Sequence, residues 1–130
     1  MAIEATFKNA MMDHLIGGSA YTPVQLYLSL HAVSDTELSG NGYERKALPS
    51  STVTWNDAHD GTVTNKAAIL FATASGSGWG QVAKWKLWNH ATATDAANLL
   101  WSGTLGTTIS SVSSGDNLQI LVNEMSLALK

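Results

Sequence analysis

Short stretches of alternating apolar and polar residues, separated by turns rich in glycine, serine and threonine, constrain this chain most. The stretch 26–31 has leucine at every second position, and 82–89 alternates Ala83, Trp85 and Leu87 with two lysines. A period of two is typical of a β-strand with one buried face. Because many such stretches follow one another with little helical pattern between them, the chain is predicted to be mainly β, an antiparallel β-sandwich.

The predicted strands are short and number about seven to nine. They lie at 26–31, 43–48, 53–55, 62–64, 68–73, 82–89, 99–105, 118–122 and 125–129. The serine-rich segment 109–115 is predicted to be a loop, as are 34–42 and the glycine-rich segment 75–80.

The only good helical pattern lies at the N-terminus, over residues 3–16. One apolar residue per turn forms a single stripe there: Ile3, Phe7, Met11 and Leu15. Gly17-Gly18 follows as a helix stop. The stripe either packs on its own domain or serves as a docking arm for a neighbouring subunit. We therefore predict a single domain over 1–130, with a helical segment at 1–17 and a β-sandwich at 21–130.

Length and composition set further limits. A chain of 130 residues suffices for one domain with its own core. There is no cysteine, so disulfides and thiolate metal sites are excluded. The N-terminus does not resemble a secretory signal, and the longest apolar run, 67–72, is far shorter than the roughly 20 residues that span a bilayer. The expectation is a protein made in a reducing cytosol, without membrane insertion.

Charge is sparse, at 13% of residues and a net charge of −3. The basic excess of a nucleic-acid binder is missing, so no nucleic-acid partner is expected. A weakly charged surface rich in serine and threonine, together with five tryptophans, suits a body that meets other protein surfaces.

Motifs for catalysis, cofactors or metals fail on inspection. The four histidines lie on different predicted elements and none has a histidine partner four residues away: His14, His31, His59 and His90. The turn 56–61 departs from the EF-hand pattern, because Ala58 and Ala67 occupy ligand positions. The run 76–80 lacks the following helix of a phosphate loop. No catalytic residue, cofactor site or metal site is predicted.

Apolar residues fall on both faces of the predicted strands. Trp85 belongs to the inward face, whereas Trp88 is in register with the two lysines. Such a pattern indicates either a second packing layer or subunit contacts. The candidate interface residues are Trp88, Lys84, Lys86, Leu100 and Leu121. The lysines are either solvated or paired with carboxylates of a neighbouring subunit.

Trp79 lies in the glycine-rich loop and is the one good candidate for an aromatic platform that touches a host glycan. The alternative is a loop anchor that is tucked into the domain.

Eight motifs occur along nearly the whole chain in a fixed order. They are Leu26–His31, Gly42–Arg45, Gly61–Phe71, Trp79–Val82, Leu87–Asn89, Asn98–Leu105, Gly115–Ile120 and Met125–Leu129. In order and spacing they resemble the small tail-fibre proteins of tailed bacteriophages, with patterns such as "GYaR", "GtvtNxaaitF" and "gnLLfsGaL". Residues 33–36 depart from the family, which often has Asp-Pro in this acidic loop.

The resemblance implies a structural virion protein, a tail fibre or tail-associated component, made in the host cytoplasm. Its partners would be other copies of itself and other virion proteins. A capsid decoration or collar protein is the first alternative. A carbohydrate-binding module for host adhesion is the second. An enzyme such as a depolymerase would need a pair of carboxylates about 5–9 Å apart, and few acidic residues lie on predicted strands, so no enzymatic activity is expected.

Overall fold

The computed structural model describes residues 2–20, 25–51 and 53–128. The elements in chain order are β1 (Ala2–Ile3), α1 (Ala5–Leu15), β2 (Leu26–His31), β3 (Lys46–Leu48), β4 (Thr62–Thr64), β5 (Ile69–Leu70), β6 (Gly80–Trp88), the short 3₁₀ helix η1 (Ala96–Asn98), β7 (Leu99–Val112), β8 (Gln119–Ile120) and β9 (Ser126–Ala128). The predicted mainly β, antiparallel fold with one short N-terminal helix is confirmed.

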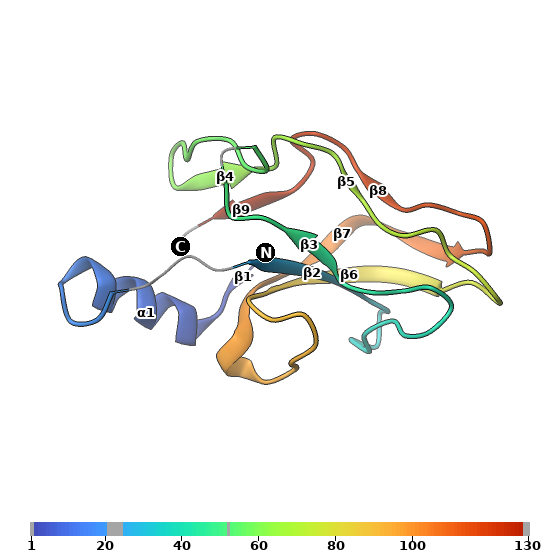
Figure 1. The fold of residues 1–130 in the computed structure, drawn as a ribbon, viewed down its shortest axis with the longest axis horizontal. Coiled ribbons are helices and arrows are strands. Elements are labelled where there is room, and N and C mark those ends of the chain that lie inside the picture. Colours follow the sequence, from blue (N-terminus) through green and yellow to red (C-terminus); the bar gives the residue numbers. More distant parts are fainter. Residues whose placement is uncertain (1, 21–24, 52, 129–130) are drawn as a thin grey trace.

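The strands form two layers. The first is a five-stranded antiparallel sheet in the order β1-β7-β6-β2-β3. The second consists of two two-stranded ribbons, β4 with β9 and β5 with β8, which run along one side of the sheet (Figure 1). The main apolar core lies between these layers and takes side chains from both.

The leucine alternation of β2 sets the register of this core. Leu28 pairs with Leu87 of β6, and Leu30 pairs with Trp85. Directly opposite residues of an antiparallel pair share a face of the sheet, so these four side chains point together into the core. Leu28, Leu30 and Leu87 are fully buried. From the second layer, Phe71 and other apolar residues close the core.

Strand β7 is longer and less regular than predicted. Val82 pairs with Ile109 and Lys84 with Thr104, so β7 advances five residues while β6 advances two. The three extra residues form a bulge, which bends a strand locally. Beyond the bulge the ladder resumes, and β7 continues to Val112. The prediction of a loop from residue 109 is therefore wrong up to Val112. Val53–Trp55, predicted as a strand, makes only a single bridge between Trp55 and Asn65.

The N-terminal segment divides into a strand and a helix. Ile3 belongs to β1, which pairs with Trp101 of β7, and α1 begins at Ala5. Ile3, Phe7 and Leu100 form a second small core, with the Phe7 ring 5.0 Å from that of Trp101. The predicted helix over 1–17 is therefore too long at its start.

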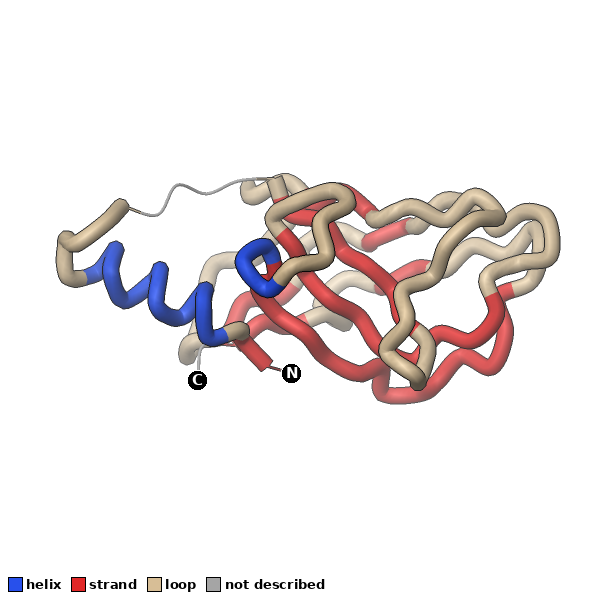
Figure 2. The backbone as a smooth tube through the Cα atoms, turned by 90° about the horizontal axis from the view of Figure 1, so that it is seen from below, coloured by secondary structure: helices blue, strands red, loops and turns tan. Residues whose placement is uncertain are grey.

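The helix stripe is used only in part. Phe7 is 8% exposed, whereas Leu15 is 76% exposed. Figure 2 shows α1 extending away from the strands. The loops that follow β5 and β7 lie at the opposite end of the molecule (Figure 1). One end of the molecule is therefore formed by a helix and the other by loops.

Candidate functional site

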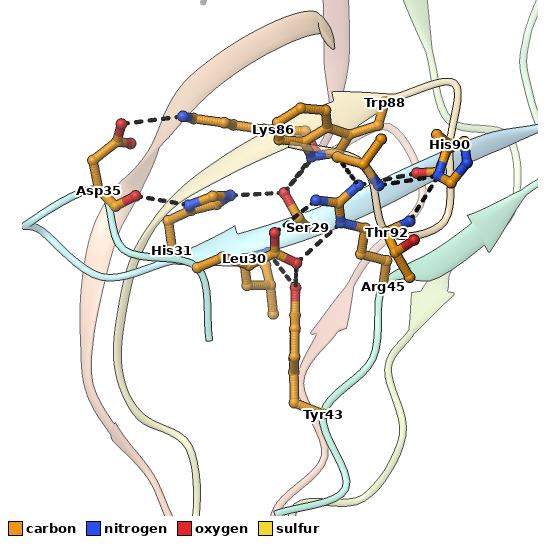
Figure 3. A network of polar contacts seen from close by, with 12 residues as sticks. Ser29, Leu30, His31, Asp35, Tyr43, Arg45, Lys86, Trp88, His90 and Thr92 are labelled. Atoms are coloured by element: carbon orange, nitrogen blue, oxygen red, sulfur yellow. Dashed lines mark hydrogen bonds and ion pairs between the residues drawn. The ribbon is translucent and has the colours of Figure 1, made fainter. Parts of the chain in front are cut away.

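The outer face of β2 and β6 carries a buried polar network (Figure 3). Ser29, at its centre, is fully buried. Its Oγ accepts a hydrogen bond of 2.7 Å from Trp88 Nε1 and lies 2.8 Å from His31 Nε2. A serine and a histidine in contact form a nucleophile–base pair in many enzymes. Here no substrate can reach the serine, so the pair is part of the packing.

The partners of His31 assign its tautomer. Nδ1 lies 3.0 Å from the carbonyl oxygen of Asp35, which only accepts hydrogen bonds, so Nδ1 carries the proton. Nε2 then accepts from the Ser29 hydroxyl in the neutral ring. Burial lowers the pKa of His31 and outweighs the backbone hydrogen bond that would raise it. The Lys86 carbonyl, 3.3 Å from Ser29 Oγ, can accept the hydroxyl proton if the ring becomes charged.

Arg45 connects three parts of the chain. Its side chain is 4% exposed and binds Glu37 through two hydrogen bonds, from Nε at 3.0 Å and Nη2 at 2.7 Å. Nη1 donates to the carbonyls of His90 and Ala93. The guanidinium lies 4.2 Å from the centre of the Trp88 ring. Only arginine offers this planar fork together with stacking on an aromatic ring.

Tyr43 completes the network by binding Glu37 and the backbone of β2 (Figure 3). Its hydroxyl donates to Glu37 Oε2 and accepts from the backbone amide of Leu30, both at 3.0 Å. Burial raises the pKa of Tyr43 far above its usual value. For Glu37, burial alone would raise the pKa, but hydrogen bonds and charge from Arg45 lower it. The ion pair of Arg45 and Glu37 thus holds the loops 32–42 and 89–98 against the sheet. Both of its members make further hydrogen bonds, Arg45 to two carbonyls and Glu37 to Tyr43.

Trp88 and Leu100, two of the predicted interface residues, are buried at 3% exposure each. Trp88 is covered by Arg45, and Leu100 by Ile3 and Phe7. The outward position on their strands was predicted correctly, but the exposure that an interface role assumes is absent. A second packing layer within the same chain, the alternative left open above, accounts for both side chains.

The lysines and Leu121 stay at the surface. Lys86 Nζ lies 3.1 Å from Asp35 Oδ2, and Lys84 Nζ lies 4.0 Å from Asp35 Oδ1. The hydrogen bond from Lys86 lowers the pKa of Asp35. Both lysines therefore have a carboxylate partner in their own chain. Leu121 is 58% exposed beside Val122, in the turn before β9.

Trp79 is an anchor and not an exposed platform. It is 8% exposed, and its Nε1 donates to the Asn41 carbonyl at 2.9 Å. The rings of Tyr43 and Phe71 meet it edge-on, with ring centres at 5.5 and 6.4 Å. A sugar stacks on an aromatic face that is open to solvent, and Trp79 offers none.

Around Trp79, hydrogen bonds join three loops, which contain Asn41, residues 74–79 and residues 113–116. We call these tied loops the tip; the sequence did not reveal that they meet. Asn41 donates from its amide to Ser77 Oγ and to the Gly78 carbonyl. Ala74 and Asp116 join the other two loops through a backbone hydrogen bond of 2.9 Å. The signal for this role was the flanking pair of glycines at 40 and 42, since all three residues adopt positive φ.

The turn at 56–61, which invited comparison with a calcium loop, closes a hairpin. His59 and Thr62 exchange two backbone hydrogen bonds, and Asp60 and Gly61 between them both have positive φ. These are the features of a type I′ turn. Among the described residues, no three His, Asp or Glu side chains gather as a metal site would need. In the same residues no helix is long and apolar enough to cross a membrane.

Comparison with known protein families decides the relationship. The model of a family described as podophage GP4 fiber I protein gp80 matches residues 2–128. The chain belongs to this family. The resemblance to small tail-fibre proteins of tailed bacteriophages is thereby confirmed, and the protein is a virion-associated member of a phage fibre family. Among curated proteins no match was found.

Proposed function

We propose that this chain is a structural building block of a podophage fibre, made in the host cytoplasm and assembled through contacts with copies of itself and with other virion proteins. Residues 1–130 act in it as one domain. The observation that carries the proposal is the family match over residues 2–128. Because the family is named for a fibre, a fibre is favoured over a capsid decoration or a collar.

The difference between the two ends of the molecule supports this role. At one end, α1 exposes Met12 and Leu15, and Ile16 directly after the helix is exposed as well. Exposed apolar clusters mark protein–protein contacts, so this end is the one that joins the assembly. At the other end, the exposed residues of the tied loops are small and polar. That end suits a surface that faces solvent or the host.

The remaining predicted interface residues enter the proposal as contacts on the side of the body. Leu121 is apolar and exposed. Lys84 and Lys86 share a single carboxylate, Asp35, so they retain positive charge for a neighbouring acidic side chain. Trp88 and Leu100 take no part in this surface. No observation favours glycan binding at Trp79 or catalysis at the enclosed Ser29.

Labelled particles test the proposal. An epitope inserted between Ser113 and Ser114, two exposed residues of the tip, replaces no core side chain. Immunogold electron microscopy of phage carrying this insertion should place gold on fibres at the tail, several copies to a fibre. Gold spread over the capsid would support a decoration protein instead, and gold confined to the neck would support a collar. Particles without label would contradict a structural role in the virion.

A further inference from the structure

Helix α1 has a wider apolar arc than its own body covers. At about 100° per residue, Phe7, Met11 and Leu15 span roughly 80° of the helix, and Met12 lies at roughly 140°, on the far side of Lys8. A helix that packs on one surface buries an apolar stripe at least about 100° wide. In this chain Phe7 is buried and Met11 half-buried, whereas Met12 is 58% and Leu15 76% exposed. Ile16, which follows the helix, is 74% exposed. We call Met12, Leu15 and Ile16 the outer stripe.

An apolar groove of about 560 Å³ runs between α1 and the β4–β9 ribbon. Phe7 and Met11 form one wall, and Trp55, Val63 and Leu127 contribute to the other. Grooves that hold a ligand the size of a few side chains have volumes of about 300–1,000 Å³. The outer stripe does not line this groove. Among the described residues, the outer stripe and the groove are therefore two separate apolar surfaces, and neither covers the other.

We propose that the outer stripe of one copy occupies the groove of a second copy. Charge supports the same pairing. Lys8, which is exposed, lies on the helix between Leu15 and Met12 in angular order, while the exposed Asp57 stands at the rim of the groove. When the stripe of one copy enters the groove, its Lys8 meets Asp57 of the second copy. This contact rests on the homo-oligomeric assembly proposed above and assigns the surfaces that make it.

Two variants of the full-length chain separate the two halves of the contact. The double substitution Leu15→Ser with Ile16→Ser removes the two most exposed of the three apolar side chains of the outer stripe, and because both are exposed the fold loses no core contact. Ala58→Arg fills the groove with a long cation that also repels Lys8. Ala58 is exposed and lines the groove. Val33→Ser is the matched control, because Val33 is 57% exposed and lies outside the helix and the groove.

Sedimentation equilibrium of each purified protein measures the self-association, and circular dichroism checks that each variant is folded. Wild type and Val33→Ser should associate with the same dissociation constant. In the stripe variant and the groove variant the dissociation constant should rise by at least about tenfold.

Mixing the two weakened variants gives the decisive result. The stripe variant keeps an intact groove and the groove variant keeps an intact stripe, so an equimolar mixture should form heterodimers, which native mass spectrometry distinguishes from homodimers. Absence of heterodimers, or wild-type association of Ala58→Arg, would overturn the stripe-in-groove contact. In either case an associating wild type would leave the homo-oligomeric proposal intact. A wild type that is monomeric at about 200 μM would overturn both, while immunogold labelling would still test the place of the protein in the virion.

Discussion

The indole ring of Trp85 lies directly over Gly103 on the neighbouring strand. The two residues are paired in the register of β6 and β7. A Cβ atom at position 103 would lie 2.6 Å from Cζ2 of the ring, closer than real contacts allow. Glycine is needed here for space, since its φ is not in the left-handed region. Gly103 belongs to the motif Asn98–Leu105, one of the eight that carry the fibre-protein resemblance.

Gly103→Ala should destabilise the protein by about 1–3 kcal/mol, the usual cost of overpacking a core. Gly106→Ala on the same strand is the matched control, because nothing lies within 4 Å of its added Cβ. Alanine there should be neutral or stabilise by up to about 1 kcal/mol. Urea denaturation followed by tryptophan fluorescence measures both. Equal effects of the two substitutions would show that the ring moves aside without cost.

Asn65→Ala should cost at least about 3 kcal/mol. The fully buried Asn65 side chain donates to the carbonyls of Ala67 and Leu121 and accepts from the amide of Met125. Removing it takes the partner from the buried amide of Met125 and breaks two part-buried hydrogen bonds to carbonyl oxygens, and each group left unsatisfied costs about 1–3 kcal/mol. Asn117→Ala is the control: its one side-chain hydrogen bond, to Thr73, is exposed, so the change should stay below about 1 kcal/mol. Thermal and urea denaturation of the two variants provide the comparison.

Arg45→Ala should cost about 3–5 kcal/mol, the range for a buried ion pair that loses one partner. Glu37 and two carbonyl oxygens lose their donors together. Arg45→Lys should also destabilise, although less, because an ammonium cannot hold the carboxylate with a fork. Lys46→Ala, at the next position, should change stability by no more than about 0.5 kcal/mol. If Arg45→Lys matched wild type, the bidentate geometry would be energetically unimportant.

Stability should fall as the pH is lowered from neutral, in two steps. Burial lowers the folded-state pKa of His31 below its ordinary value of 6.5. The unfolded chain therefore binds a proton first, and the stability that neutral His31 contributes is lost as the pH falls below 6.5. Arg45 holds the pKa of Glu37 below 4.5, so a second loss begins under that pH. Urea denaturation at pH 7.5, 5.5 and 4 measures both steps.

His31→Gln should remove the first step and keep the second, whereas His59→Gln, at an exposed histidine, should keep both. The assigned tautomer has its own check, because ¹⁵N chemical shifts of the imidazole should show the proton on Nδ1 at pH 7.5. A proton on Nε2 would contradict the contact with the Asp35 carbonyl.

Trp79→Ala and Trp85→Ala should destabilise to a similar extent, by about 3–5 kcal/mol each, the range for a large aromatic side chain lost from a core. Trp79 holds the tied loops and Trp85 fills the space between the layers. Chemical denaturation of both variants tests this. A loss below about 1 kcal/mol at Trp79 would indicate that the loops keep their shape without it.

The sequence predicted best where burial repeats with a simple period. Strand β2 has the bounds that its leucines indicated, and β6 covers most of its predicted range. Strand β7 was underestimated, because Ser110 and Ser111 favoured a loop, whereas Ile109 and Val112 on either side of them pair with β6 and keep the segment extended. Strand preference depends on neighbours more than on the residue itself, so no local pattern could have given this length.

The buried network was partly visible in the sequence and partly hidden. Trp88 was placed on the correct face, and Gly42–Arg45 was singled out as a motif. The link between them was not predictable, because Arg45 reaches Trp88 from a distant part of the chain and the only local sign was an arginine after a turn. The burial of Leu100 was not predictable either, because the residues that cover it, Ile3 and Phe7, lie far away in the sequence.

The pairing of the strands also governs when the protein can fold during its synthesis. Strand β1 pairs with Trp101 and Ser102, and β4 pairs with Leu127 and its neighbours. Leu127 is itself buried in the core. A nascent chain that has not yet emerged as far as Leu127 therefore has an open core and unpaired strand edges, both of which favour aggregation. The body can therefore close only after nearly all of residues 2–128 have left the ribosome.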